Sequence, residues 1–469
     1  MKTRSLCIVY LILTFLVFPL LSMEKAQACS TFKLQKGGKL LYGHNLNEGD
    51  IGVPGLVFVN KRSVFKTGRT WSELTTVDRS NPSSHTWISR YGSITFNCFG
   101  RDLPDGGMNE AGLYIWEMNE DAAYPENTGK PKLDQMNWMQ YLLDLYSTTE
   151  EAIACASEIE ISGWGWHFFV GDAHGNTAAI AFIDGEVVVH KGENMPVPAL
   201  FNTPYPREME LLKYYKGYGG LYEIDLDDPQ VPRFVKTARL IDMYDAEQDI
   251  VDYGFHILEK ITVFDVPEWS VVFDVTSQKL FYKTRISPGI KTLSLANVDF
   301  SNSGPVIMVD MDEIEESTIA EHFVPFTQER MHSFIEKKLI PILPEEFFTT
   351  GGLSLEEYME RTAKHTLRAS QSESQFFQGT WRTEEEVGLS LTISCNEDRV
   401  IGSVSNGKDL YALDHLYMIG NRLTCTFRTK GKRLMEAKLK MEGSKLEMKL
   451  FTTEESAGVF QFTKTADPL

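Results

Sequence analysis

A cysteine at a predicted processing site constrains this chain more than any other sequence feature. Cys29 follows Ala26-Gln27-Ala28, a small-x-small pattern that signal peptidase accepts. Two basic residues open the chain and residues 6–21 form an apolar run, so residues 1–28 are predicted to be a signal peptide. Cleavage after Ala28 would make Cys29 the first residue of the mature protein.

An N-terminal cysteine can act as a complete catalytic unit. It carries a thiol nucleophile and an α-amine, whose ordinary pKa of roughly 7.7–8.0 lets it accept a proton near neutral pH. Two other interpretations stay open: Cys29 is merely the residue after the cleavage site, or it is a lipidated lipoprotein cysteine. The polar spacer Met23-Glu24-Lys25 and Gln27 fit a lipobox poorly. We therefore expect a secreted or periplasmic protein, with lipid anchoring less favoured.

The charge of the chain argues against nucleic acid and anionic membranes as partners. The formal net charge is −19, and removal of residues 1–28, which carry +2, would leave −21 over 441 residues. Such a surface repels polyanions. Beyond the signal, no apolar run reaches the ~18 residues that a membrane span needs. We predict neither nucleic-acid binding nor a transmembrane segment after signal removal.

Metal and cofactor chemistry lack their usual sequence anchors. The mature cysteines show no metal-ligand spacing, and H-E-x-x-H, C-x-x-C, G-x-S-x-G and P-loop motifs are absent from the sequence. We therefore predict no metal and no cofactor. Five mature cysteines are an odd number, so at least one thiol stays unpaired, and a Cys395–Cys425 disulfide is left open.

Residues 29–313 mix strand and helix patterns without a regular βαβ rhythm, which predicts an α+β fold. A hairpin is expected around Gly37-Gly38, so the candidate nucleophile opens a strand. The other strands are predicted at 93–98, 112–116, 167–171, 177–183 and 186–190, the last three as a meander. Helices are predicted at 133–145, 149–157, 206–215 and 234–247.

The composition changes after residue 313. A helical segment is predicted over 314–369, with helices at 327–340 and 354–367. Residues 376–464 alternate short strands with turns at 406–407, 420–421 and 443–444, which predicts a separate small β sandwich or barrel. Gly379-Thr380-Trp381 resembles the opening of lipocalin-type barrels, although a packing tryptophan is favoured over a ligand pocket.

Several short motifs occur together in one order: Cys29-Ser30-Thr31-Phe32, residues 42–47 (YGHNLN), residues 107–113 (GMNEAGL) and Phe201-Asn202-Thr203-Pro204. In this order the chain resembles the choloylglycine hydrolase and penicillin V acylase family of linear-amide hydrolases. The resemblance covers about residues 29–313 and includes residues 167–172 and 231–235. It implies the αββα four-layer sandwich of N-terminal-nucleophile hydrolases for that part, followed by the helical segment and the small all-β domain.

The resemblance also implies roles for four residues. Cys29 would attack an amide carbonyl, and its α-amine would pass the thiol proton to the leaving nitrogen. Asn119, ten residues beyond Asn109, and Asn202 match the side chains that hold the oxyanion in the family. Arg233 matches the arginine beside the sulfur, where a fixed positive charge favours thiolate over thiol.

Two supporting positions depart from the family pattern. His44 and Asn47 stand where relatives usually carry arginine and aspartate. Asn47 can still accept a hydrogen bond from the α-amine, but it gives the protonated amine less electrostatic support. His44 adds positive charge only when protonated, with an ordinary pKa near 6.5, so we expect a pH response that differs from that of relatives.

The sequence therefore predicts a secreted cysteine hydrolase that cleaves a linear carboxamide through a Cys29 thioester. Small N-acyl amides are the expected partners: N-acyl amino acids, bile salts, penicillin V or acyl-homoserine lactones, and a homo-oligomer is compatible with the family. Two alternatives remain. One is an acyltransferase that uses the same thioester, and the other is a secreted or lipid-anchored binding protein that keeps the fold without catalysis.

Overall fold

The computed structural model describes residues 29–47, 52–62, 64–76, 83, 85–262, 267–301, 306–342, 352, 354, 377–383, 388–396, 399–419, 422–431, 433–442, 445–452 and 456–465. The predicted signal peptide, the linker at 370–374 and the turns at 420–421 and 443–444 lie outside the described residues. Of the helix predicted at 354–367, only Ser354 is described.

A six-stranded antiparallel sheet, here sheet A, begins directly after Cys29. In the order of pairing it contains β14 (Ala199–Phe201), β1 (Ser30–Lys36), β2 (Lys39–Leu46), β15 (Trp269–Asp274), β16 (Lys279–Thr284) and β17 (Lys291–Ser294). Gly37 and Gly38 turn β1 into β2 with φ of 60° and 78°, left-handed values that glycine adopts without strain. The predicted hairpin is confirmed, and Cys29, the candidate nucleophile, lies directly before its first strand.

A nine-stranded antiparallel sheet within the described residues, here sheet B, stacks on sheet A. In pairing order it contains β13 (Glu186–Lys191), β12 (Thr177–Ile183), β11 (Trp166–Gly171), β8 (Tyr114–Asn119), β7 (Gly106–Asn109), β6 (Ser93–Asn97), β3 (Leu56–Asn60), β18 (Ile307–Asp310) and β19 (Val324–Pro325). The two sheets share a core, in which the Tyr42 and Tyr114 rings stack at 4.6 Å. Thr31 of β1 also meets the Tyr114 hydroxyl at 3.0 Å.

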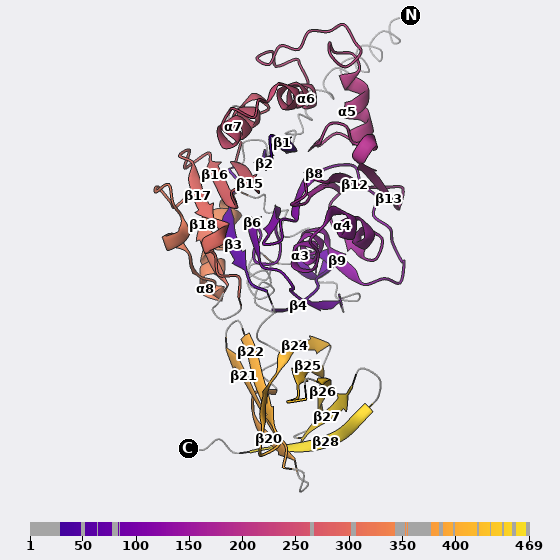
Figure 1. Cartoon of the computed structure of the whole chain (residues 1–469), viewed down its shortest axis with the longest axis vertical. Helices are drawn as coiled ribbons and strands as arrows, with labels where there is room; N and C mark the ends of the chain where they lie inside the picture. The colour runs from indigo at the N-terminus through magenta and orange to yellow at the C-terminus, as the bar shows by residue number, and fades with distance from the viewer. Residues whose placement is uncertain are drawn as a thin grey trace, which may run out of the picture.

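Helices cover the outer faces of both sheets, which gives the four layers of an αββα sandwich (Figure 1). Over sheet A lie α6 (Arg233–Met243) and α7 (Ile250–Lys260), with α5 (Tyr205–Leu212) beside α6. Over sheet B lie α3 (Gln135–Leu145) and α4 (Thr149–Ala156). Smaller elements complete this unit: α2 (Trp71–Thr75), α8 (Gln328–Phe334), β4 (Phe65–Thr67), β5 (Thr86–Ile88), β9 (Lys132–Asp134) and β10 (Glu160–Ser162).

Side-chain caps explain where several of these helices begin. Asp134 accepts hydrogen bonds from the backbone N–H groups of Met136 and Asn137, so α3 starts after it, two residues later than the sequence predicted. Thr148 and Glu151 form a reciprocal capping box at the start of α4. These caps set the first residues of α3 and α4.

The C-terminal region forms one antiparallel sheet with its own core, which confirms the predicted β domain in outline. Its described strands, in pairing order, are β23 (Leu410–Ala412), β22 (Arg399–Ser405), β21 (Ser390–Asn396), β20 (Gly379–Thr383), β28 (Ser456–Lys464), β27 (Lys445–Phe451), β26 (Leu434–Glu442), β25 (Arg422–Arg428) and β24 (Asp414–Ile419). Trp381 is buried and donates its indole N–H to the Phe377 carbonyl at 2.8 Å. This tryptophan packs the domain core.

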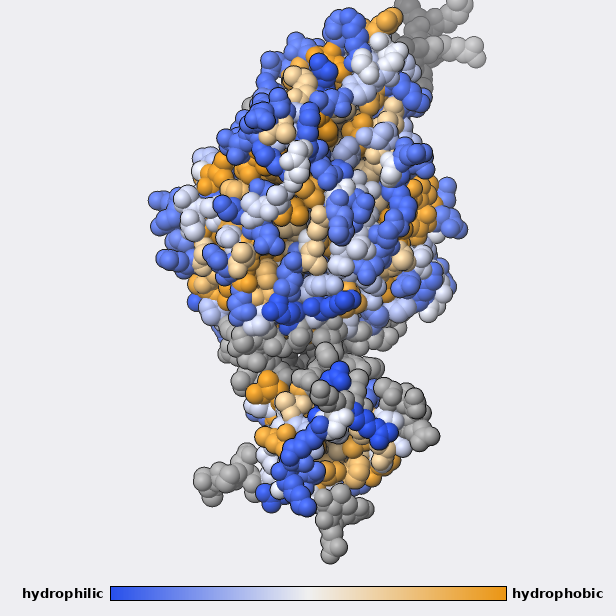
Figure 2. Space-filling view, viewed as in Figure 1, coloured by the Kyte–Doolittle hydropathy of each residue, from blue (hydrophilic) through white to orange (hydrophobic). Residues whose placement is uncertain are grey.

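Hydrophilic side chains occupy most of the face in Figure 2, with apolar side chains scattered between them. None of the helices in the described part of the chain is long and apolar enough to cross a membrane. Cys155 and Cys425 are buried free thiols, so Cys425 is not in a disulfide in this structure.

Candidate active site

Cys29 lies at one end of sheet A, immediately before β1. Ser30 pairs with Phe201 of β14 on one side and with Asn45 of β2 on the other. Continuing this register by one residue sets Cys29 opposite Asn202 and Leu46. Only 1% of Cys29 is exposed. Because side chains alternate along a strand, Cys29 shares the face of Thr31, which points toward sheet B.

Arg233 brings a positive charge to this end of the sheet. It is the first residue of α6, after Pro232, and its guanidinium lies 4.8 Å from the centre of the Phe201 ring. Burial lowers the pKa of Arg233 to about 10, while the negative charges of Cys29 and Glu208 oppose that shift. The arginine therefore stays charged at neutral pH and is placed to attract a thiolate at Cys29.

Asn119 ends β8 in sheet B, and a tryptophan holds its side-chain amide. The indole N–H of Trp166 donates to Asn119 Oδ1 at 2.8 Å. With its oxygen engaged, the amide keeps two N–H donors for another acceptor. Trp166 also belongs to an aromatic cluster, here the tryptophan cluster, in which neighbouring ring centres lie 4.3–5.9 Å apart: Trp71, Phe99, Trp164 and Trp166.

His44 is fully buried and neutral, and it lies between the two sheets. Its ring stacks on Trp116 of β8 with the centroids 3.8 Å apart, and neither ring nitrogen has a hydrogen-bond partner among the described residues. Burial lowers the pKa of His44 well below its ordinary value. The apolar stacked environment thus disfavours the imidazolium at this position, and the pH response expected from the sequence stays a prediction.

Asn47 follows β2 directly and is 2% exposed, at the same end of sheet A as Cys29. Its neighbour Asn45, which the sequence did not single out, fixes the strand. Asn45 donates to the Leu258 carbonyl of α7 at 2.9 Å and accepts from the Ser270 hydroxyl of β15 at 2.7 Å. The end of β2 is thus tied to the helix layer and to the neighbouring strand.

Sequence reasoning also missed a histidine and a glutamate beside the site. His167 of β11 bonds through Nε2 to the Phe201 carbonyl oxygen at 2.6 Å, and its Nδ1 lies 3.3 Å from Glu120 Oε2. The hydrogen bond from His167 to Phe201 joins the end of sheet B that carries Asn119 to the end of sheet A that carries Asn202. Only the stacking of the two sheets brings these groups together, so no local sequence pattern signals them.

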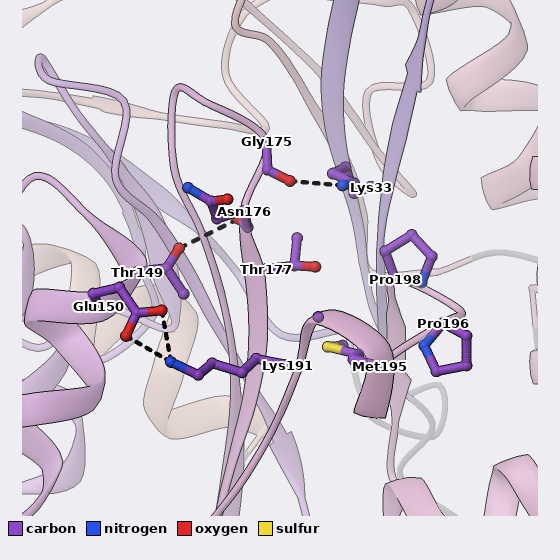
Figure 3. Close-up of a pocket in the computed structure, with 11 residues that line it drawn as sticks. Lys33, Thr149, Glu150, Gly175, Asn176, Thr177, Lys191, Met195, Pro196 and Pro198 are labelled. Carbon is purple, nitrogen blue, oxygen red and sulfur yellow. Dashed lines mark hydrogen bonds and ion pairs between the residues drawn. The ribbon is translucent and has the colours of Figure 1, made fainter.

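The pocket in Figure 3 is separate from the candidate catalytic residues. It has a volume of about 440 Å³, and none of Cys29, Asn119, Asn202 or Arg233 lines it. Lys33 reaches the Gly175 carbonyl at 2.6 Å and Lys191 pairs with Glu150 at 2.6 Å, so both cations on this wall are engaged (Figure 3). Among the described residues no cluster of His, Cys, Asp or Glu could hold a metal ion.

No family model matches the chain. A penicillin V acylase from Pectobacterium atrosepticum is 25% identical over 264 residues, which is 46% of this chain and 70% of that protein. The structure of penicillin V acylase from Agrobacterium tumefaciens aligns with a TM-score of 0.54 and 21% identity over 64% of this chain and 98% of that one. A variant of conjugated bile acid hydrolase from Clostridium perfringens gives a TM-score of 0.46 and 16% identity, over 61% and 98% of the two chains.

The four layers share their fold with the penicillin V acylase structure from Agrobacterium tumefaciens, and Cys29 lies directly before the first strand of sheet A. In both sequence and fold the chain therefore resembles penicillin V acylases.

Proposed function

We propose that this protein is an exported amidase that uses Cys29, freed as the N-terminal residue, to hydrolyse a linear N-acyl amide. The observation that carries the proposal is the position of Cys29 directly before β1, opposite Asn202 when the strand register is continued by one residue, and within electrostatic reach of Arg233. The penicillin V acylase relative from Pectobacterium atrosepticum supports the same reaction class.

In the proposed reaction the α-amine of Cys29 takes the thiol proton, and Sγ forms a bond to the amide carbonyl carbon. The side-chain N–H groups of Asn119 and Asn202 hold the oxyanion. Collapse breaks the C–N bond, and the ammonium proton passes to the leaving nitrogen. Water then attacks the thioester with the same amine as base. The products are a carboxylic acid and an amine.

For the substrate we propose an amide with an apolar, aromatic or long-chain acyl group. The tryptophan cluster adjoins Asn119 through Trp166, and Trp71 and Trp164 are only partly buried. An apolar wall next to an oxyanion donor suits an acyl chain better than a charged group. Penicillin V and N-acyl amino acids with aromatic or fatty acyl groups both fit this description.

The first test is the intact mass of the exported protein, with and without a small thiol alkylator, followed by peptide mapping. We expect a chain that begins at an unlipidated Cys29 and alkylates there much faster than at Cys98 or Cys155. A lipid on Cys29, an uncleaved Met1 or an inert thiol would contradict the mechanism and favour a binding protein.

The second test is product analysis with a panel of N-acyl amides, using Cys29→Ala as the matched inactive control. Release of free carboxylic acid and amine, abolished by Cys29→Ala, is the expected result. Transfer of the acyl group to an added amine in preference to water would instead identify an acyltransferase.

A further inference from the structure

One buried side chain joins the two sheets beside Cys29. His167 is 1% exposed, and the Glu120 side chain next to it is 4% exposed. The imidazole spans from the Phe201 carbonyl oxygen in sheet A, at 2.6 Å, to a carboxylate oxygen of Glu120, the residue directly after β8 of sheet B, at 3.3 Å. No step of the proposed reaction uses either group.

The hydrogen positions on this pair follow from what each atom can do. A carbonyl oxygen only accepts, so Nε2 must carry a proton and donate it to Phe201. On the other side of the ring, Nδ1 lies 3.3 Å from Glu120 Oε2. The hydrogen bond to Phe201 and the polar contact with Glu120, on opposite sides of the ring, fix its orientation.

The two ends of this link adjoin the two candidate oxyanion donors. Glu120 follows Asn119 in sheet B, and Phe201 precedes Asn202 in sheet A. The Phe201 carbonyl belongs to the same planar peptide unit as the Asn202 N–H, so a bond to that oxygen also orients the backbone that carries Asn202. The contacts of His167 with Phe201 and Glu120 therefore affect the positions of both Asn119 and Asn202.

Oxyanion stabilisation needs this kind of control because each donor must lie about 2.7–3.1 Å from the oxygen of the tetrahedral intermediate. Asn119 and Asn202 stand on different sheets, and sliding of one sheet against the other would change their separation. A buried hydrogen bond between the sheets at this point resists such sliding.

We propose that His167, oriented by Glu120, is a positioning residue that sets the separation of the Asn119 and Asn202 amides in the oxyanion hole. This inference rests on the proposed function, because it assigns His167 to the same reaction. It differs from a purely stabilising role in one respect: loss of the link should affect the chemical step more than substrate binding or the reactivity of Cys29.

The test compares His167→Leu, His167→Gln and Glu120→Gln with the unmodified protein for kcat, KM and the rate at which Cys29 is alkylated. Alkylation forms no oxyanion, so it reports on the nucleophile alone. Gln is chosen as the conservative replacement because its Nε2 can reach the position of the imidazole Nε2 and still donate to the Phe201 carbonyl, whereas Asn would shorten the side chain. The matched control is His174→Asn, an exposed histidine in the β11–β12 turn.

For His167→Leu we expect kcat to fall about 100-fold, the scale of a lost oxyanion donor, with KM and the alkylation rate within about threefold of their original values. His167→Gln should recover most of kcat, and Glu120→Gln should fall between the two. His174→Asn should leave all three quantities unchanged.

The inference is overturned if His167→Leu keeps kcat, or if His167→Leu and Glu120→Gln lower kcat and Cys29 alkylation in parallel, as general disruption would. If His167→Leu does not fold, Glu120→Gln decides alone. Failure of the proposed function looks different, because the unmodified protein would then hydrolyse no N-acyl amide.

Discussion

At the scale of single residues, the direction of the Asn119 amide depends on one indole N–H. Trp166→Phe keeps an aromatic ring but removes the donor that engages Asn119 Oδ1, so the amide can turn its oxygen toward the site. We expect kcat to fall about tenfold with little change in KM, less than the roughly 10²–10³-fold loss of a whole donor. Steady-state kinetics on the best N-acyl amide measure this.

The matched control is Trp164→Phe, which changes a neighbouring ring of the tryptophan cluster without touching Asn119. It should leave kcat close to the original value and alter mainly KM. Equal losses of kcat in both variants would mean that ring packing, and not the Trp166 N–H, controls the reaction.

Asn47 gives a second prediction at this scale. In Asn47→Asp a carboxylate replaces the amide that we propose contacts the Cys29 amine, and negative charge stabilises the protonated amine. Because the reaction needs the neutral amine as base, the acidic limb of the kcat/KM profile should move to higher pH by up to about 1 unit. An unmoved limb would place Asn47 out of contact with the amine.

The sequence predicted Cys29, Asn119, Asn202 and Arg233 through motif order, and their roles stay predictions until these variants are measured. What it could not predict is the set of groups that positions them. Trp166 and His167 stood in a predicted strand, but the atoms they contact lie on β8 and β14. Such contacts depend on how two sheets stack, which no local pattern encodes.

At the scale of elements, the strands and helices that were predicted within residues 29–313 are present in the structure, with ends shifted by a few residues. The hairpin of β1 and β2 and the meander of β11, β12 and β13 were predicted correctly. The missed elements include β3 and β15, whose residues are all buried. A strand covered on both faces has no polar alternation to reveal it.

The connection between β6 and β7 yields a prediction about pH and stability. Asp105 accepts hydrogen bonds from the Cys98 N–H at 2.8 Å and from its thiol at 3.3 Å, and burial raises the pKa of Asp105 to about 7. Between its unfolded pKa of 3.8 and about 7, the native state holds this proton and the unfolded state does not. Asp105 therefore makes the free energy of unfolding fall as pH rises through that window.

Asp105→Asn removes this titration. Urea unfolding at pH 5 and pH 8 should show the variant gaining stability relative to the original protein by at least about 1 kcal/mol at the higher pH. The control Asp121→Asn changes an exposed carboxylate and should give the same difference at both pH values. A pH-independent difference for Asp105→Asn would contradict the raised pKa.

At the scale of the whole molecule, the αββα unit and the C-terminal sheet have separate hydrophobic cores. The C-terminal core of described residues centres on Trp381, Leu391 and Phe462, and it shares no residue with the cores around Cys29, α3 or α8. Separate cores allow separate unfolding, because each unit buries its own apolar surface. Trp381→Ala should therefore destabilise only the C-terminal unit, by about 3–5 kcal/mol.

Calorimetry combined with activity tests this independence. We expect Trp381→Ala to move one thermal transition to lower temperature while amide hydrolysis and Cys29 alkylation keep their rates. Trp138→Ala is the matched control, since Trp138 is fully buried between α3 and sheet B, with its ring 4.8 Å from that of Phe168. Trp138→Ala should lower the temperature of the transition of the αββα unit and remove activity at the temperature where that unit unfolds. If activity instead declines with the Trp381→Ala transition, the two units fold as one, and the C-terminal sheet contributes to the stability of the active site.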